Sequence, residues 1–224
     1  MAYRLSVDQF IGHFREAQAS IENVASPFQR KILFAAALDP LSRGAFGPRG
    51  KKDLHRDWIV RLLTELAGWT DATRVSLPQL KLLLRDQGRH RYRLYREVSS
   101  RLKQWPNGLY VPATRSPSSA EISAFAASEE HDALARCQYV QLFYTYRNNL
   151  VHEYREPGYG TDWGRPRNDP FYTSSIYGPW ELVFPVAFFS TLFTRALTGV
   201  EAHLLATRTN PHNNFEFGSL WRAK

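Results

Sequence analysis

Apolar residues recur at intervals of three and four along most of the chain, the spacing that buries one face of a helix. In the first half of the chain, this spacing predicts five helices, over about residues 6–21, 27–38, 53–67, 77–85 and 89–103. We expect the second of these to end at Asp39-Pro40, because proline removes a backbone donor inside a helix. The pattern therefore predicts a mainly helical first half.

The longest uninterrupted helical pattern lies in the second half. Residues 121–155 contain neither glycine nor proline, and their apolar residues keep roughly helical spacing. We expect a helix from about Ser119 that is ended by Pro157-Gly158. A last helix, over 186–206, is apolar on several faces, which is typical of a deeply buried helix or a dimer contact.

Alternating apolar and aromatic residues around a Gly-Pro pair predict a small β-hairpin near 171–184. We therefore predict an all-α fold, a bundle of about six helices with this hairpin inserted. The chain is expected to be one domain of residues 1–224. Its predicted segments are basic N-terminal helices (1–118), the motif helix (119–158), a long loop with the hairpin (159–185), a C-terminal helix (186–206) and a tail (207–224).

Composition narrows the class of protein. The single cysteine, Cys137, excludes a framework of internal disulfides and favours a reducing compartment. No stretch reaches the ~20 apolar residues of a membrane span, and the first residues lack a signal-peptide core. We therefore expect a cytoplasmic protein without membrane contact. No residues have metal-ligand spacing, so neither a metal nor another cofactor is expected.

The net charge of +8 is unevenly distributed. Residues 1–119 carry 20 Lys and Arg against 10 Asp and Glu, whereas residues 120–224 carry 9 against 11. The segment 89–103 interleaves cations with tyrosines, which suits contact with phosphates and stacking on bases. The candidate RNA-binding residues are Arg89, Arg91, Tyr92, Arg93, Tyr95, Arg96, Arg165 and Arg167. The alternative is a solvated helix whose apolar face packs on the core.

The run Arg147-Asn148-Asn149-Leu150-Val151-His152 carries the most specific chemistry. It combines a permanent cation, an amide and an imidazole that titrates near neutral pH. The Arg-x4-His spacing alone decides nothing, because Arg85 and His90 repeat it beside a glycine. Only the first run lies in a strong helical pattern. There Asn148 and His152 share a face, while Arg147 lies about 140° around the helix from His152.

This run, continued by Glu153-Tyr154, resembles the signature of the HEPN superfamily (higher eukaryotes and prokaryotes nucleotide-binding domains). Arg147 matches its arginine, Asn148 its polar position and His152 its histidine. The resemblance covers about residues 121–158. It implies a helical bundle that dimerises, so that two motifs form one composite cleft. Members of the family typically cleave RNA without a metal, through the ribose 2′-hydroxyl, and leave a 2′,3′-cyclic phosphate.

The resemblance implies roles for the motif residues. His152 would transfer protons, Arg147 would stabilise charge on the phosphate, and Asn148 would orient either of them. Tyr154 matches a tyrosine of toxin-type members that a partner nucleotidyltransferase can modify; packing or stacking on the substrate is the alternative. The implied setting is toxin–antitoxin or antiviral defence, with an antitoxin or nucleotidyltransferase as partner.

Two other readings stay open. Arg147 could cap helix carbonyls and His152 could be an ordinary histidine at a helix end. The protein would then be a non-catalytic module that binds RNA or a nucleotide, or a scaffold that binds an acidic partner.

Overall fold

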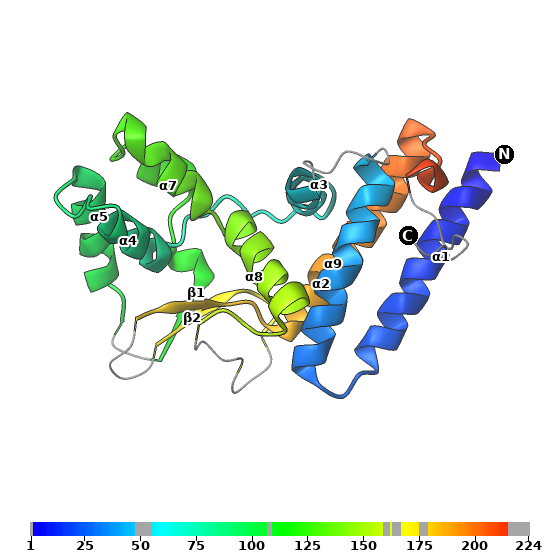
Figure 1. Cartoon of the computed structure of the whole chain (residues 1–224), viewed down its shortest axis with the longest axis horizontal. Helices are drawn as coiled ribbons and strands as arrows, with labels where there is room; N and C mark the ends of the chain where they lie inside the picture. Colours follow the sequence, from blue (N-terminus) through cyan, green and yellow to red (C-terminus); the bar gives the residue numbers. More distant parts are fainter. Residues whose placement is uncertain are drawn as a thin grey trace, which may run out of the picture. The chain divides into compact units, whose positions relative to one another are not determined.

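The fold is mainly helical, as predicted. The computed structural model describes residues 2–47, 55–106, 109–158, 162, 167–174 and 179–214. Within those ranges it contains nine α-helices and one small antiparallel sheet (Figure 1). The predicted number of about six helices is too low, because segments that the hydrophobic pattern merges are separate helices. None of the described helices has the length and apolar character needed to cross a membrane.

The chain divides into two compact units, and each is described by itself. The first combines Met1–Trp69 with Ser190–Lys224, and the second is Thr70–Phe189. Helix α9 runs from the end of the second unit into the first. Whether the two units amount to the single predicted domain stays a prediction.

The first unit is a bundle around a cluster of phenylalanines. Its helices are α1 (Ala2–Glu22), α2 (Pro27–Phe46), α3 (His55–Arg61) and most of α9 (Val186–Thr207), with a π-helical turn at Leu62–Leu66 and a 3₁₀ turn at Pro211–Asn213. The ring of Phe193 on α9 lies 5.5 Å from that of Phe34 and 6.5 Å from that of Phe14. All three rings are buried, so this unit has its own apolar core.

Helix α2 does not stop at Asp39-Pro40, as the sequence predicted. It begins with Ser26 as N-cap and continues through Pro40 to Phe46. A proline inside a helix costs about 3 kcal/mol. Continuing the helix buries Leu41 completely and Ala45 almost completely. Full burial of one leucine returns about 1.5–3 kcal/mol. Burial of these side chains therefore offsets most of the free-energy cost of the proline, and the predicted end of the helix was wrong.

The second unit packs short helices against the sheet. Its helices are α4 (Leu77–Asp86), α5 (Arg93–Lys103), α6 (Ser119–Ser123), α7 (His131–Arg136) and α8 (Tyr139–Glu153), and its strands are β1 (Tyr110–Pro112), β2 (Phe171–Thr173) and β3 (Glu181–Val183). Strands β2 and β3 form the predicted hairpin, with Tyr172 opposite Leu182. Strand β1 adds a third strand, with Val111 opposite Tyr172. The hairpin's turn lies outside the described residues.

The helix predicted over 119–158 is interrupted. Helices α6, α7 and α8 are separate, with a 3₁₀ turn at Ser128–Glu130 between the first two. At the break before α8, the Ser76 amide donates to the Cys137 carbonyl over 2.9 Å, and the Tyr139 amide donates to the Arg74 carbonyl over 2.9 Å. These backbone groups bond to a distant segment instead of to the preceding helical turn. The prediction of one helix was therefore wrong, although α8 itself carries the whole motif.

A buried cluster of hydroxyl groups joins the start of α8 to the sheet. The Tyr172 hydroxyl lies 2.8 Å from the Ser76 Oγ, 2.9 Å from the Ser116 Oγ and 2.9 Å from the Tyr139 hydroxyl. Burial raises the pKa of Tyr172 to about 12, so its phenol stays protonated at neutral pH. The cluster fixes the position of the N-terminal ends of α4 and α8 on strand β2.

Replacing Tyr172 with phenylalanine is expected to lower the free energy of unfolding by about 1–3 kcal/mol, because buried partners lose a hydrogen bond. Urea unfolding measures the change. Tyr92→Phe is the matched control, since the Tyr92 side chain is 41% exposed; there the expected change is within about 0.5 kcal/mol. Equal effects of the two substitutions would contradict a structural role for the cluster.

Candidate active site on helix α8

Helix α8 places the motif at its C-terminal end. Its buried residues are Tyr139, Val140, Phe143, Tyr146, Arg147 and Leu150. The rings of Phe143 and Tyr146 pack on Phe184, with centroids 5.2 and 5.3 Å apart. The apolar face of the motif helix is thus held against the segment that follows β3, which sets the direction of the motif residues.

Arg147 and Asn148 are brought together by the structure. The Arg147 side chain is 7% exposed, and its Nη1 donates to the Asn148 Oδ1 over 3.0 Å. An arginine is rarely buried without such partners. The hydrogen bond fixes both the guanidinium and the amide, and the amide nitrogen of Asn148 then points away from Arg147.

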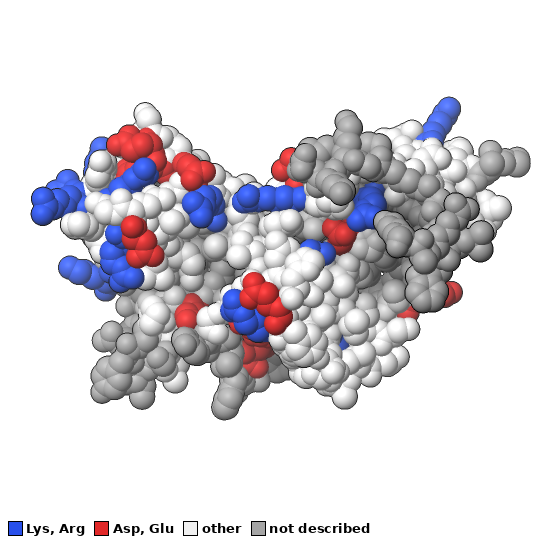
Figure 2. All heavy atoms as spheres, in the orientation of Figure 1, with Lys and Arg blue, Asp and Glu red and all other residues white. Residues whose placement is uncertain are grey.

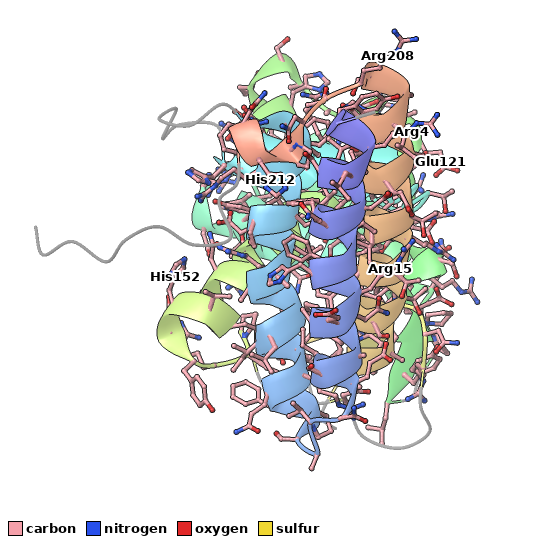
Figure 3. All side chains as sticks on the ribbon, turned by 90° about the vertical axis from the view of Figure 1, so that its right-hand side faces the viewer. Arg4, Arg15, Glu121, His152, Arg208 and His212 are labelled. Carbon is pink, nitrogen blue, oxygen red and sulfur yellow. The ribbon has the colours of Figure 1, made fainter. Side chains whose placement is uncertain are left out.

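His152 lies on the outer side of the same helix. It is exposed in the last turn of α8, and Figure 3 shows its side chain projecting away from the ribbon. Asn148 precedes it by four residues, so the two share a face. Among the described residues the imidazole forms no hydrogen bond or ion pair, with Arg147 or with any other group. Within one copy of the chain, Asn148 is hydrogen-bonded to Arg147 and lies on the same face of α8 as His152.

Tyr154 ends the helix. Its φ of 52° is left-handed, an uncommon conformation for a residue other than glycine. Its amide donates to the Asn149 carbonyl, and its side chain is 63% exposed. Helix α8 therefore stops at Glu153, four residues before the predicted stop at Pro157-Gly158. The exposed ring directly follows the motif, where either modification or stacking on a substrate is sterically feasible.

The candidate RNA-binding residues around α5 are only partly free for a ligand. Arg89 donates to the backbone carbonyl of Glu129, and the Arg93 guanidinium lies 4.9 Å from the Phe125 ring centroid. Tyr92 forms the N-cap of α5. Figure 2 shows cationic side chains over this part of the second unit, with acidic side chains beside them.

The remaining candidates differ in exposure. Arg91 and Arg96 are exposed, and Tyr95 is half-buried. Helix α5 packs on α4, and no hydrogen bond or ion pair joins the described side chains of this segment to the motif. The structure therefore leaves RNA contact at α5 as a prediction.

Arg167 belongs to the sheet. Its guanidinium lies 4.3 Å from the Tyr110 ring centroid and 4.8 Å from that of Phe171, so it bridges β1 and β2 by cation–π contacts. The side chain is half-buried. Arg165 lies outside the described residues.

A pocket beside the motif was not anticipated from the sequence. It has a volume of about 160 Å³ and lies wholly within the second unit. Its lining residues are Gln79, Leu142, Thr145, Tyr146, Pro157, Gly158, Glu181, Leu182 and Phe184. Thr145 precedes Asn148 by three residues and His152 by seven, so it lies on the same face of α8. Only the Pro157-Gly158 pair gave a local signal; Gln79 and Glu181 come from distant segments.

Two carboxylates lie near the phenol of Tyr146, whose ring lines this pocket. Burial, together with the hydrogen-bonded Glu156 and the nearby Asp162, raises the pKa of Tyr146 well above its ordinary value. Asp162 also accepts a hydrogen bond from the Val186 amide over 3.1 Å and so caps α9. Carboxylate acceptors therefore lie close to the Tyr146 side of the pocket.

The described part of the chain contains no group of three or more His, Cys, Asp and Glu side chains that could hold a metal ion. Cys137 is buried, and burial raises the pKa of its thiol to about 12. That thiol is protonated at neutral pH and is a poor nucleophile. Its chemistry is that of an ordinary core residue.

No protein-family model, curated protein or solved structure matches this chain.

Proposed function

We propose that this protein is a metal-independent endoribonuclease of the HEPN type that acts as a homodimer, in toxin–antitoxin or antiviral defence. One observation carries the proposal most directly. The Arg147 guanidinium is hydrogen-bonded to Asn148, and an exposed histidine follows one helical turn later on the face of that amide. Phosphodiester transfer needs a cation that stabilises charge on the phosphate and a group that transfers protons, and this motif carries both on one helix.

The reaction is an attack of the ribose 2′-oxygen on the adjacent phosphorus. A base takes the 2′-hydroxyl proton, a P–O bond forms to the 2′-oxygen, and the bond to the 5′-oxygen breaks. An acid then gives that 5′-oxygen a proton, which leaves a 2′,3′-cyclic phosphate and a 5′-hydroxyl. His152 takes one of the two proton-transfer roles. Arg147 stabilises the charge on the non-bridging oxygens.

A second copy of the chain supplies what one copy lacks. Within one copy, Arg147 lies on the buried side of α8 and His152 on the exposed side, about 140° apart around the helix. The reaction needs both a base and an acid. Two motifs facing each other across a two-fold axis bring two imidazoles to one phosphate, which is the reason for proposing a dimer.

A non-catalytic RNA-binding module is the second candidate, and one observation favours it. The His152 imidazole has no partner among the described residues that would fix its orientation. Proton transfer requires a defined geometry, whereas binding of a phosphate does not. The same motif would then hold RNA without cutting it.

The nucleophile can be tested on the substrate. After the cleavage sites in an oligoribonucleotide are mapped, a single 2′-deoxyribose is placed immediately 5′ to one scissile phosphate. We expect cleavage there to be lost and cleavage at the other sites to persist, because only that 2′-hydroxyl is missing. A deoxyribose immediately 3′ to the same phosphate is the control and should be cut. Cleavage at the first substituted position, or no cleavage of the unsubstituted RNA, would contradict the proposal.

A further inference from the structure

We infer that the pocket beside α8 binds a guanine base of the RNA and so selects the bond that is cut. The inference rests on the proposed nuclease function and names the nucleotide that this site prefers. Three properties of the pocket carry it: its position on the motif face, its shape and walls, and the hydrogen-bonding groups that line it.

The position links the pocket to the reaction. Thr145 in the pocket wall and His152 in the motif are separated by two turns on one face of α8, about 10 Å along the helix axis. Asn148 lies between them on that face. Pro157 and Gly158, which follow the motif, form another part of the wall. A nucleotide whose phosphate lies at the motif therefore has its base within reach of the pocket.

The walls suit a flat, largely apolar ring. Leu142, Pro157 and Leu182 line the pocket together with the aromatic rings of Tyr146 and Phe184. Unpaired RNA bases are commonly bound by stacking in such surroundings. The nearby carboxylates of Glu181, Glu156 and Asp162 disfavour a phosphate in the same place, because like charges repel. A neutral base fits this environment, and an anion does not.

The polar groups distinguish guanine from the other bases. Glu181 offers carboxylate oxygens, which only accept hydrogen bonds. Guanine alone presents two adjacent donors, N1–H and the N2 amino group, to such a carboxylate. Adenine and cytosine place an acceptor nitrogen beside their amino group, and uracil flanks its single N–H with carbonyls. A carboxylate in a base pocket therefore favours guanine.

Gln79 complements this selection. Its Oε1 accepts a hydrogen bond from the Ser76 hydroxyl, which belongs to the buried cluster around Tyr172. The side-chain amide of Gln79 is thereby held with its NH₂ group free of that bond. This group is a donor in the pocket wall, suited to the O6 acceptor of guanine.

The backbone leaves room for the carboxylate. Gly158 has a φ of 74°, and a Cβ built there would lie 2.9 Å from the Glu181 Oε2. A side chain at this position would be strained and would push the carboxylate away. Gly158→Ala therefore displaces the Glu181 carboxylate without removing it.

The test combines binding with cleavage and uses the full chain. Isothermal titration compares guanosine 3′-monophosphate with the adenosine, cytidine and uridine 3′-monophosphates, and cleavage of an RNA of mixed sequence maps the cut sites. We expect wild type to bind the guanosine nucleotide at least about tenfold more tightly than the others and to cut 3′ to guanosine. Glu181→Gln should lose about tenfold of that affinity, and Gly158→Ala should lose affinity in the same direction.

Glu65→Gln is the matched control, because it makes the same change of charge at an exposed residue of the other unit that pairs with Arg61. It should keep the wild-type preference. Binding without discrimination, or a guanine preference retained by Glu181→Gln, would overturn the inference. Cleavage without guanine preference would overturn the inference and leave the nuclease standing. Guanine binding that depends on Glu181, without cleavage, would support the pocket and overturn the nuclease.

Discussion

RNA cleavage is expected to fall by about 10²–10⁴-fold when His152 is replaced with alanine, which is the contribution of a positioned acid or base. The side chain is exposed and makes no hydrogen bond among the described residues, so its removal should leave folding unchanged. The effect should therefore be on the rate constant of cleavage and not on stability. Single-turnover cleavage of end-labelled RNA measures the rate, and circular dichroism checks the fold.

The chain provides its own control for this substitution. His90 is also exposed and also follows an arginine by five positions, at Arg85. His90→Ala should cut RNA at the wild-type rate. Equal rates for wild type and His152→Ala would contradict the acid–base role of His152. Equal losses in His90→Ala and His152→Ala would show that the effect is not specific to the motif on α8.

Arg147→Lys is expected to reduce cleavage by about 10²–10³-fold, the usual loss when a donor to the reacting group's oxygens is removed. Lysine keeps the charge but cannot bind phosphate oxygens bidentately. It also cannot reproduce the rigid guanidinium that donates to the Asn148 Oδ1. The charge-preserving substitution therefore separates geometry from simple attraction to RNA.

Arg85→Lys is the matched control for Arg147→Lys. Arg85 is an exposed surface arginine next to Asp86, in the second Arg-x4-His run. Its substitution should leave both cleavage and the unfolding temperature unchanged. If Arg147→Lys instead cleaves at the wild-type rate, or loses cleavage only in step with loss of the folded helix, Arg147 merely stabilises the end of α8.

The sequence predicted the elements that are long and strongly periodic. Helices α1 and α9 lie close to their predicted ranges, and β2 pairs with β3 as the hairpin predicted near 171–184. The same local reasoning failed where contacts with distant segments determine where a helix begins or ends. The break before α8 depends on two backbone hydrogen bonds, from the Ser76 amide to the Cys137 carbonyl and from the Tyr139 amide to the Arg74 carbonyl. No pattern within residues 119–158 contains that information.

Strand β1 was missed for a similar reason. Its three residues pair with β2, about sixty residues later in the chain, and a segment this short has no periodicity of its own. Helix α2 passes through Pro40 because burial of Leu41 and Ala45 offsets most of the free-energy cost of a proline inside a helix. In both places tertiary packing overrides the local preference.

The candidate site also has features that the sequence predicts and features that only the fold determines. The motif residues Arg147, Asn148 and His152 are adjacent on one helix, so their shared position was predictable from spacing. The contact between Arg147 and Asn148, and the exposure of His152, required the structure. Gln79 and Glu181 meet Thr145 only through the fold, so the pocket could not have been derived from any local run.

The central claim is that the motif on α8 cuts RNA without a metal. The most direct measurement incubates wild type and His152→Ala side by side with end-labelled RNA in excess EDTA and determines the chemistry of the new ends. The account predicts cleavage by wild type alone, with 2′,3′-cyclic phosphate and 5′-hydroxyl ends. Equal cleavage by both proteins, or wild-type cleavage that EDTA abolishes, would contradict it.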